Sequence, residues 1–344
     1  MKILYAIQGT GNGHMARAYE VIPELKKYGE VDILVSGTQT DIELPWPVKY
    51  RYHGMGFIFG KNGGVDLRES IKKTRLFTFL KEVFSVPIHR YNLVINDFEP
   101  VSAWACKLRG KRCIGLSHQS AVLHADAPKP IEKDNIGKNI LKYYAPANFN
   151  YGFHFNSIAD NISTPVIRSD IRIAVKKNLG HYTVYLPSYS DEKIIAVLSK
   201  VPYIKWHVFS KHNTQPKEIG NITIQPVNKA KFTESFLTCT GILCNAGFET
   251  PAEALYMGKK LCVIPMKGQY EQQCNSAFLG SMGIKTLTDF ESGIEGINEW
   301  VFFENAVSVH YPNNLPGVID DLMARFTTQY EPMPEMAISS QFKI

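Results

Sequence analysis

The sequence of 344 residues lacks several features that would each have assigned it to a class of protein. It has no run approaching the roughly 18 consecutive apolar residues of a membrane-spanning helix. Its N-terminus lacks the charged, apolar and small-residue order of a signal peptide. None of its six cysteines forms a C-x-x-C pair. We therefore expect a cytoplasmic protein with buried free thiols, and neither disulfides nor a zinc site.

Two common nucleotide-binding motifs are absent as well. The first apolar run is followed by Gly9-Thr10-Gly11-Asn12-Gly13-His14. A dinucleotide fingerprint, G-x-G-x-x-G, would need glycine at the position of His14. The phosphate loop G-x-x-x-x-G-K-[ST] does not occur either. These absences argue against nicotinamide-dependent and ordinary P-loop chemistry.

The composition indicates a globular protein with an anionic partner. Apolar residues make up 44% of the chain and charged residues 20%. The net charge of +6 lies in the first half, because residues 1–165 hold 21 Lys and Arg against 15 Asp and Glu, whereas residues 166–344 hold 17 of each kind. Such asymmetry favours an anionic ligand on the first half. We expect no nucleic acid partner.

Apolar runs and helical patterns alternate twice along the chain, which predicts two doubly wound α/β domains. In the first half the expected strands are 3–9, 31–36, 93–96, 112–116 and 151–155, with helices at 14–28, 67–84 and 100–109. In the second half they are 183–187, 204–209, 222–227, 241–244 and 261–265, with helices at 191–200, 230–238, 250–258 and 271–282. The domains expected are 1–165, 166–312, a helix within 313–330 that could pack back on the first domain, and a tail at 331–344.

The glycine loop at residues 9–14 predicts a strand, a tight bend and a helix start. Its glycines permit positive φ and the close approach of another molecule, and a helix start offers free N–H groups to an anion. His14 adds a titratable base, which indicates group transfer. The alternative is a tight turn with an incidental histidine.

A second strand, glycine and helix start follows at residues 241–258. Thr250 and Pro251 suit the N-cap and first position of a helix. Glu253 lies three residues after Thr250, so it would either close a capping box or accept hydrogen bonds from the two hydroxyls of a ribose. The turn as a whole predicts a diphosphate cradle.

A polar run follows the next strand, at Gln269, Glu271, Gln272 and Gln273. Strand ends of open α/β sheets border the ligand crevice, so these amides and the carboxylate are candidates to bind sugar hydroxyls. The alternative is a solvated polar helix start.

Taken together, these motifs resemble those of the GT-B nucleotide-sugar glycosyltransferases, especially the MurG family of peptidoglycan N-acetylglucosaminyltransferases. The chain also resembles an uncharacterised prokaryotic group that begins with a closely similar G-T-G-N-G-H loop. The resemblance implies two Rossmann-like domains facing across a cleft. It also implies transfer of a sugar from a nucleotide-sugar, expected to be a UDP-sugar, to a hydroxyl acceptor. The nucleotide-sugar would be a substrate, so no cofactor is expected.

The resemblance also assigns roles to residues. On the donor side, the backbone at Phe248, Glu249 and Thr250 would meet the diphosphate beside Gly247, Glu253 would bind the ribose, and Gln272 and Gln273 would bind the sugar. Ser188 would contact a phosphate, although Pro187 and Tyr189 replace the family's glycines in that loop. Phe209 would lie either beside the nucleobase or in the core. On the acceptor side the resemblance points to Gly11, Asn12, Gly13 and His118.

His14 and Asp97 are the catalytic candidates. His14 suits a general base because a helix N-terminus disfavours the imidazolium; it would otherwise anchor the acceptor. Asp97 would orient His14, act as the base itself, or only cap the helix near Pro100, and Glu99 is a weaker candidate for these roles. No D-x-D triplet occurs, and neither Glu249 nor Glu253 has a glutamate eight positions on. We therefore expect inversion without a metal.

The basic first half contains a candidate membrane-binding surface. Residues 54–64 combine glycines with large apolar side chains. In the expected helix at 67–84, Leu76, Phe77, Leu80, Val83 and Phe84 share a face bordered by Lys72, Lys73, Arg75 and Lys81. This pattern favours peripheral contact with an anionic membrane surface or a lipid-linked acceptor. The alternative is an ordinary core-facing helix.

Two other functions fit the same motifs. One is a nucleotide-sugar epimerase of the same fold, which would react with the donor without an acceptor. The other is a non-catalytic sugar-nucleotide-binding protein, in which His14 and Asp97 would have no chemical role.

Overall fold

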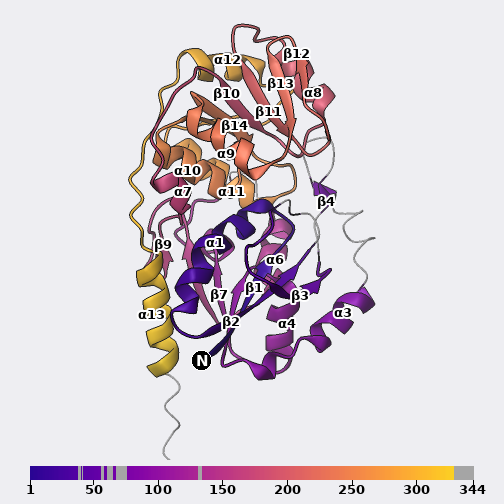
Figure 1. The fold of residues 1–344 in the computed structure, drawn as a ribbon, viewed down its shortest axis with the longest axis vertical. Coiled ribbons are helices and arrows are strands. Elements are labelled where there is room, and N and C mark those ends of the chain that lie inside the picture. The colour runs from indigo at the N-terminus through magenta and orange to yellow at the C-terminus, as the bar shows by residue number, and fades with distance from the viewer. Residues whose placement is uncertain are drawn as a thin grey trace, which may run out of the picture.

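The fold consists of two α/β halves stacked along the long axis of the molecule (Figure 1). The computed structural model describes residues 1–37, 40, 42–55, 58–59, 65–66, 76–130 and 134–328. These residues form two seven-stranded sheets and a small antiparallel pair, β4 (Ile58–Phe59) with β5 (Val65–Asp66). The strand interiors are apolar and buried, so each sheet carries helices on both of its faces.

The first sheet is parallel throughout, in the order β3-β2-β1-β6-β7-β8-β9. Its strands are β1 (Lys2–Gln8), β2 (Glu30–Ser36), β3 (Val48–Tyr52), β6 (Leu93–Asp97), β7 (Cys113–Ser117), β8 (Phe149–Phe153) and β9 (Ile162–Ser163). The helices of this half are α1 (Asn12–Lys26), α3 (Leu76–Ser85), the short 3₁₀ helix η1 (Ile88–Arg90), α4 (Pro100–Leu108), α5 (His118–Val122) and α6 (Asn135–Tyr144).

The second sheet has the order β12-β13-β11-β10-β14-β15-β16, and only the pairing of β12 with β13 is antiparallel among its described strands. Its strands are β10 (Tyr182–Tyr185), β11 (Trp206–Ser210), β12 (Lys217–Ile219), β13 (Ile222–Pro226), β14 (Gly241–Asn245), β15 (Lys260–Ile264) and β16 (Lys285–Thr286). Its helices are α8 (Asp191–Leu198), α9 (Lys229–Thr238), α10 (Glu249–Met257), α11 (Tyr270–Ser281) and α12 (Ile294–Phe302).

Each sheet has a topological switch point, where the strand order reverses. In the first sheet β1 lies between β2 and β6, and in the second β10 lies between β11 and β14. Loops that leave neighbouring strands in opposite directions open a crevice at the carboxyl ends of those strands. The glycine loop after β1 borders the first crevice, and the turn after β14 borders the second.

Local sequence explains why the helices beside these crevices form. The buried positions of α1 include Met15, Ala18, Ile22 and Leu25, which recur at helical spacing. At the start of α4, Pro100 occupies the first turn and the Glu99 carboxylate accepts hydrogen bonds from two backbone N–H groups, at 2.6 and 2.7 Å.

The chain crosses between the halves twice, and the two crossings lie together. Arg172, in the short helix α7 (Ser169–Arg172) of the first crossing, donates to the carbonyls of Tyr311 and Pro312 in the second, at 2.8 and 3.2 Å. Asn314 Nδ2 donates to Thr164 Oγ1 at 3.2 Å. The connecting segments are therefore bonded to each other rather than independent.

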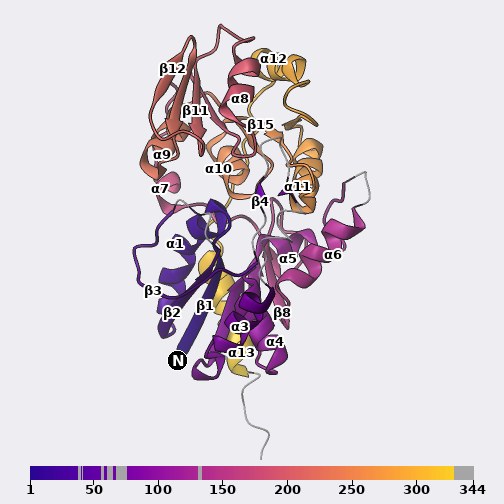
Figure 2. The same ribbon diagram turned by 90° about the vertical axis from the view of Figure 1, so that its right-hand side faces the viewer.

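The second crossing leads to α13 (Leu315–Thr328), which packs on the first half. Its side chains Ile319, Leu322 and Met323 are buried there. Figures 1 and 2 both show this helix, in yellow, alongside the half that contains the N-terminus. The chain thus begins and ends its described course in the same half.

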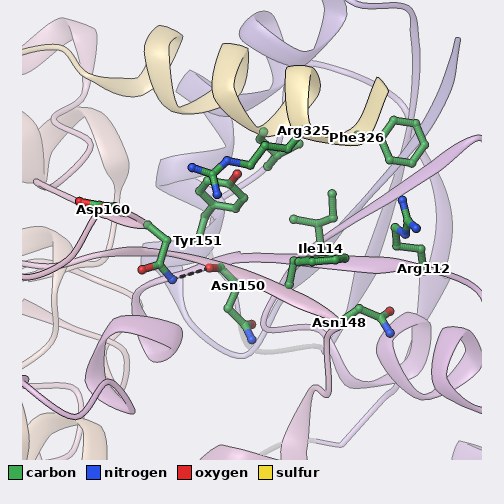
Figure 3. A pocket seen from close by; sticks show the side chains of 11 residues that line it. Arg112, Ile114, Asn148, Asn150, Tyr151, Asp160, Arg325 and Phe326 are labelled. Atoms are coloured by element: carbon green, nitrogen blue, oxygen red, sulfur yellow. Dashed lines mark hydrogen bonds between the residues drawn. The ribbon is translucent and has the colours of Figure 1, made fainter. Parts of the chain in front are cut away.

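A cavity of about 500 Å³ lies between α13 and the sheet. Figure 3 shows Asn148, Asn150 and Tyr151 of the sheet side beneath the helix, which contributes Arg325 and Phe326. Arg112 directly precedes β7, and β8 begins at Phe149, so this cavity lies at the amino ends of the strands.

The expected strands and helices are found with ends shifted by at most two residues, apart from the start of the helix expected at 67–84. The strand expected at 151–155 runs from Phe149 to Phe153 and the helix expected at 14–28 runs from Asn12 to Lys26, so both are shifted by two residues at each end. Strand β3 and helices α5, α6 and α12 were not predicted, and neither were the short elements β9, β12, β16, η1 and α7. Helix α10 begins at Glu249 after Phe248, so placing its N-cap at Thr250 was wrong. Of the expected helix at 67–84, residues 67–75 lie outside the described residues, as do 56–57, 60–64 and the tail at 331–344.

Among the helices that the structure describes, none has the length and apolar character needed to span a bilayer.

Candidate functional site

The two crevices open into one cavity between the halves. It has a volume of about 510 Å³. The first half contributes residues of the glycine loop, α1 and α5, and the second half contributes the ends of β10 and β14 and the starts of α10 and α11. Figures 1 and 2 show α1 and α10 at this boundary, and contacts join the two helices.

The position of this cavity favours it over the cavity beneath α13. Ligands of open α/β sheets bind at the carboxyl ends of strands, beside a switch point. The cavity between the halves meets this condition on both sheets, whereas the cavity of Figure 3 lies at amino ends. We therefore take the cavity between the halves as the candidate site.

The glycine loop places backbone close to other groups without positive φ. Gly11, the N-cap of α1, has φ of −149°, and neither Gly9 nor Gly13 has positive φ. A Cβ on Gly9 would lie 2.8 Å from Val35 Cγ1, and one on Gly13 would lie 2.4 Å from Glu249 Oε2. The glycines are therefore needed for close approach, and the positive φ that they permit is not adopted in this loop.

His14 lies in the first turn of α1 and is bonded to Asp97. Its Nδ1 is 2.8 Å from Asp97 Oδ1. The His14 side chain is 15% exposed, whereas that of Asp97 is fully buried at the end of β6. His14 lines the cavity and Asp97 does not. This arrangement fits Asp97 as the residue that orients His14, rather than as a base in contact with an acceptor.

Arg17 holds Asp97 from the next turn of α1. Its Nε and Nη2 donate to the two oxygens of Asp97, at 3.1 and 2.6 Å. Burial alone would raise the pKa of Asp97, but Arg17 and His14 outweigh it and hold that pKa below its ordinary value. Asp97 is therefore ionised at neutral pH.

An ionised Asp97 determines the tautomer of His14. A carboxylate only accepts hydrogen bonds, so Nδ1 carries the proton and Nε2 carries the lone pair. Gln119 supports this tautomer because its amide nitrogen donates to Glu271 at 2.9 Å and lies 3.4 Å from His14 Nε2. The lone pair of Nε2 is therefore directed at the Gln119 amide, which also lines the cavity.

The start of α10 supplies the other side of the cavity. Gly247, Phe248, Glu249 and Thr250 all line it. Within the described residues no side chain caps this helix start, so its first N–H groups are available to an anion. A Cβ on Gly247 would meet no described atom within 4 Å, which leaves space above these groups.

Glu253 is paired with Arg168 rather than closing a capping box. Arg168 Nε and Nη2 donate to its two oxygens, at 2.7 and 2.9 Å. Burial raises the pKa of Glu253, and the guanidinium acts in the opposite direction. The carboxylate lines a smaller cavity of about 90 Å³ beside the main one, together with Tyr185 and Phe232. A carboxylate accepts more than two hydrogen bonds, so this pairing leaves room for a ribose.

The remaining donor-side candidates differ in their access to the cavity. Gln272 lines it, although its Oε1 accepts from the Met266 backbone at 3.0 Å. Gln273 is not among its lining residues. Ser188 is fully buried and donates to Asn245 Oδ1 at 3.1 Å, so Pro187 reaches the cavity in its place.

His118 lines the cavity and also joins the two halves. Its ring stacks on Phe248, with centroids 3.8 Å apart. Its Nδ1 lies 2.7 Å from the Phe153 carbonyl and its Nε2 lies 2.8 Å from Asn275 Oδ1. Burial lowers the pKa of His118 to about 4, so the ring is neutral at pH 7.

Two weaker candidates have structural roles. Glu99 caps α4 and also accepts from Ser36 Oγ at 2.6 Å, and burial raises its pKa. Phe209 is buried and packs edge-on against Phe232, so it belongs to the core. Phe98, which lies between Asp97 and Glu99 in the sequence, has φ of 56°. This conformation costs energy for a residue with a bulky side chain.

Several residues of the site were missed from the sequence. Arg17 and Arg168 form its two buried ion pairs. Arg17 follows His14 by one helical turn, and a charged residue on the apolar face of a helix was the available signal. Arg168 lies outside any motif, and its partner is 85 residues away. Tyr185, Lys211 and His212 line the cavity without any sequence signal.

Across the described ranges, no group of three or more His, Cys, Asp or Glu side chains could hold a metal ion. The six cysteines are buried and unpaired.

Comparisons with known proteins identify both the fold and a family. A family model described as Glycosyl transferase family 1 matches residues 1–301. No curated protein matches the chain. Among solved structures, MurG of Acinetobacter baumannii has a TM-score of 0.53 at 14% identity, over 94% of this chain and 99% of its own.

Two further structures agree. UGT89C1 of Arabidopsis thaliana, complexed with UDP, has a TM-score of 0.55 at 11% identity over 94% of this chain and 99% of its own. The glycosyltransferase SnogD of Streptomyces nogalater has a TM-score of 0.51 at 14% identity over 95% of each chain. At these identities the likeness concerns the fold alone, and it confirms the predicted pair of Rossmann-like domains of GT-B type.

Proposed function

The chain belongs to glycosyl transferase family 1, and from this premise we propose that it moves a sugar from a nucleotide-sugar donor to a hydroxyl acceptor. The family match confirms the predicted resemblance and enzyme class. One observation carries the proposal: His14, held by Asp97, and the uncapped start of α10 line the same cavity from opposite halves.

The geometry supports an inverting transfer. The acceptor hydroxyl takes the place of the Gln119 amide beside His14 Nε2 and gives its proton to this nitrogen, while its oxygen forms a bond to C1 of the sugar. The bond between C1 and the diphosphate oxygen breaks, and its electron pair leaves with the nucleoside diphosphate. Because the base belongs to the first half and the diphosphate cradle to the second, attack and departure occur on opposite faces of C1.

The leaving diphosphate would be stabilised by the chain itself. The start of α10 directs free N–H groups and the positive end of its dipole at the cavity. Lys211 lines the same cavity and adds a positive charge. We therefore propose that turnover needs no divalent cation, and undiminished activity in a chelator would support this.

The nucleoside would occupy the smaller cavity beside α10. Tyr185 and Phe232 supply apolar walls there, and Glu253 lines the same cavity, where it would accept hydrogen bonds from a ribose. A UDP-sugar is the proposed donor, since UGT89C1 and a second neighbour, LpCGTa with a TM-score of 0.58, are both complexed with UDP. A third neighbour, SsfS6, is complexed with thymidine diphosphate, so the test includes both bases.

The acceptor is proposed to be lipid-linked or held at an anionic membrane surface. On α3, Leu76, Phe77 and Phe84 are 60%, 88% and 64% exposed. Lys81 lies on the same helix, and the first half carries the excess positive charge. Binding to vesicles should be stronger with anionic than with neutral lipid, and Phe77→Ser should weaken it. Equal binding to both vesicles would remove this part of the proposal.

A panel of nucleotide-sugars tests the central proposal. One donor should raise the thermal unfolding midpoint, because a ligand that binds only the folded state stabilises it. That donor should then be consumed only with an acceptor, and the product should have the opposite anomeric configuration. Donor conversion without an acceptor, or binding without any turnover, would contradict glycosyl transfer.

A further inference from the structure

The charges around His14 come from both halves of the molecule. Arg17 and Asp97 belong to the first half, and their side chains are 1% and 0% exposed. Arg17 Nη1 also donates to Glu249 Oε1 at 2.5 Å, and Glu249 opens α10 in the second half. The Glu249 side chain is 22% exposed. The cluster therefore has a fixed part and a part that depends on how the halves meet.

Room for the second-half carboxylate is provided by the glycine loop. A Cβ on Gly13 would lie 2.4 Å from Glu249 Oε2, so any other residue there would displace this side chain. The glycine next to His14 thus admits a carboxylate from the opposite half. The close approach of Gly13 to Glu249 and the hydrogen bond from Arg17 to Glu249 both place this carboxylate against α1.

The formal charges show what Glu249 adds. With His14 neutral, one guanidinium faces two carboxylates, and proton uptake by His14 gives two charges of each sign. Without Glu249, Arg17 and Asp97 already neutralise each other. The new imidazolium would then be a positive charge without a counter-charge, and its Nδ1 would lie 3.0 Å from Arg17 Nη2. Like charges at this distance disfavour protonation.

We propose that Glu249, acting through Arg17, is a positioning residue that prepares His14 to accept the acceptor's proton only when the second half meets the first. This inference rests on the proposed function, because it requires His14 to be the base. Glu249 touches neither the proton nor C1. Its carboxylate balances the charge that forms when the acceptor O–H proton moves to Nε2 and the diphosphate leaves with its electron pair.

The other groups that face His14 do not supply this balance. From β1, Tyr5 donates to Asp97 at 3.3 Å, and burial keeps its hydroxyl neutral by raising its pKa. From α5, Gln119 is uncharged, and His118 is neutral with its pKa lowered to about 4 by burial. From α11, Glu271 is hydrogen-bonded to Gln119 and its charge also interacts with His14, but burial raises its pKa and so weakens that charge.

The variant Glu249→Gln tests the proposal through a split between turnover and binding. We expect kcat to fall on the order of 10-fold, as loss of one nearby charge would cause. Donor affinity should stay the same or rise, because the backbone N–H groups remain and a negative charge near the diphosphate is gone. The acid limb of the kcat profile should move to lower pH, since an imidazolium without its counter-charge forms less readily.

Two further variants act as controls. Glu249→Asp keeps the charge and should restore much of the kcat and the position of the acid limb. Glu20→Gln removes another carboxylate of α1, which bonds to the first crossing where Glu20 accepts from the Ser169 backbone at 2.9 Å. It should leave the pH profile unchanged. A loss of donor affinity with unchanged kcat in Glu249→Gln would overturn the proposal.

A substrate-free measurement separates this inference from the proposed function. NMR of the histidine ring follows the protonation of His14. We expect His14 to become protonated at a lower pH in Glu249→Gln than in the unmodified protein. No such difference should occur in Glu20→Gln. If no nucleotide-sugar is turned over, the proposed function fails while this titration still tests the coupling. Identical titrations in Glu249→Gln and the unmodified protein would overturn it.

Discussion

The turn from β1 into α1 and the turn from β14 into α10 are built alike and present different groups. Both follow a buried strand at a switch point, contain glycine and lead into a helix without a side-chain cap within the described residues. The first turn presents side chains, since His14 and Arg17 come from its helix. The second presents backbone and open space above Gly247.

The glycines explain this difference. Gly9 and Gly13 admit other parts of the protein, the strand β2 and the Glu249 carboxylate, so the first turn is filled from within. Gly247 admits nothing that the structure describes. The turn into α1 is therefore suited to accept a proton, and the turn into α10 is suited to bind an anion.

Removing the His14 ring should give the largest effect. We expect His14→Ala to lower turnover by about 10² to 10⁴-fold, the usual contribution of a general base, with little change in donor affinity. Kinetics and donor titration measure the two quantities. His124→Ala, which removes a histidine of the first half outside the cavity, is the control. Equal turnover in the His14 variant would assign this residue to acceptor binding or to no chemical role.

Breaking the ion pair below the second turn should cost stability as well as binding. Glu253→Ala removes the close partner of the buried Arg168 and leaves it the more distant Asp170, at 3.5 Å, and losing the partner of a buried charge costs roughly 3 kcal/mol of unfolding free energy. Urea denaturation measures the loss. A double variant, Arg168→Met with Glu253→Gln, should recover stability while donor binding stays weak. Recovery of donor binding as well would show that Glu253 serves only the fold.

The contact between the second turn and helix α5 of the first half should weaken in acid. His118, which stacks on Phe248, has its pKa lowered by burial to about 4, against 6.5 for an unburied imidazole. The unfolded chain therefore binds more protons between these values, and stability present above about pH 6.5 is lost as the pH falls toward 4. The loss from this group is at most about 3 kcal/mol. His118→Gln should flatten the dependence of unfolding free energy on pH, and an unchanged slope would contradict the assignment.

The smallest effect should distinguish the two glycine positions directly. Gly247→Ala adds a methyl group in open space above the helix start, so we expect donor affinity to fall roughly 10-fold, about 1.4 kcal/mol, with an unchanged unfolding midpoint. Gly13→Ala pushes against Glu249, so it should lower kcat more than affinity. The reverse pattern, with Gly13→Ala acting on affinity, would mean that the first turn also holds the donor.

Much of this fold could be predicted because its strands are apolar and its turns carry distinctive residues. The glycine loop, the turn at Gly247 and their separation along the chain led to the fold and family. Helix α5 was missed because its five residues are too few to show helical periodicity. Strand β3 was missed because it alternates half-buried and exposed residues at the edge of the sheet.

The candidate site could be predicted where a local motif places a residue at the end of a strand. It could not be predicted where two residues far apart in the sequence come into contact. His14, Asp97 and the start of α10 follow strand ends, so pattern alone finds them. The partnership of Arg17 with Glu249 joins residues 232 positions apart. A single sequence contains no signal for such a contact, because it exists only once the halves have met. Arg168 with Glu253 was missed for the same reason.

The paired crossings restrict how the two halves can move. A single tether would allow one half to turn in any direction, whereas two bonded segments act as one axis. Arg172 and Asn314 fix these segments side by side. Opening of the site would therefore be a rotation about this line, with Glu249 following an arc away from Arg17. A proteolytic cut in either crossing alone would leave the halves connected by the other.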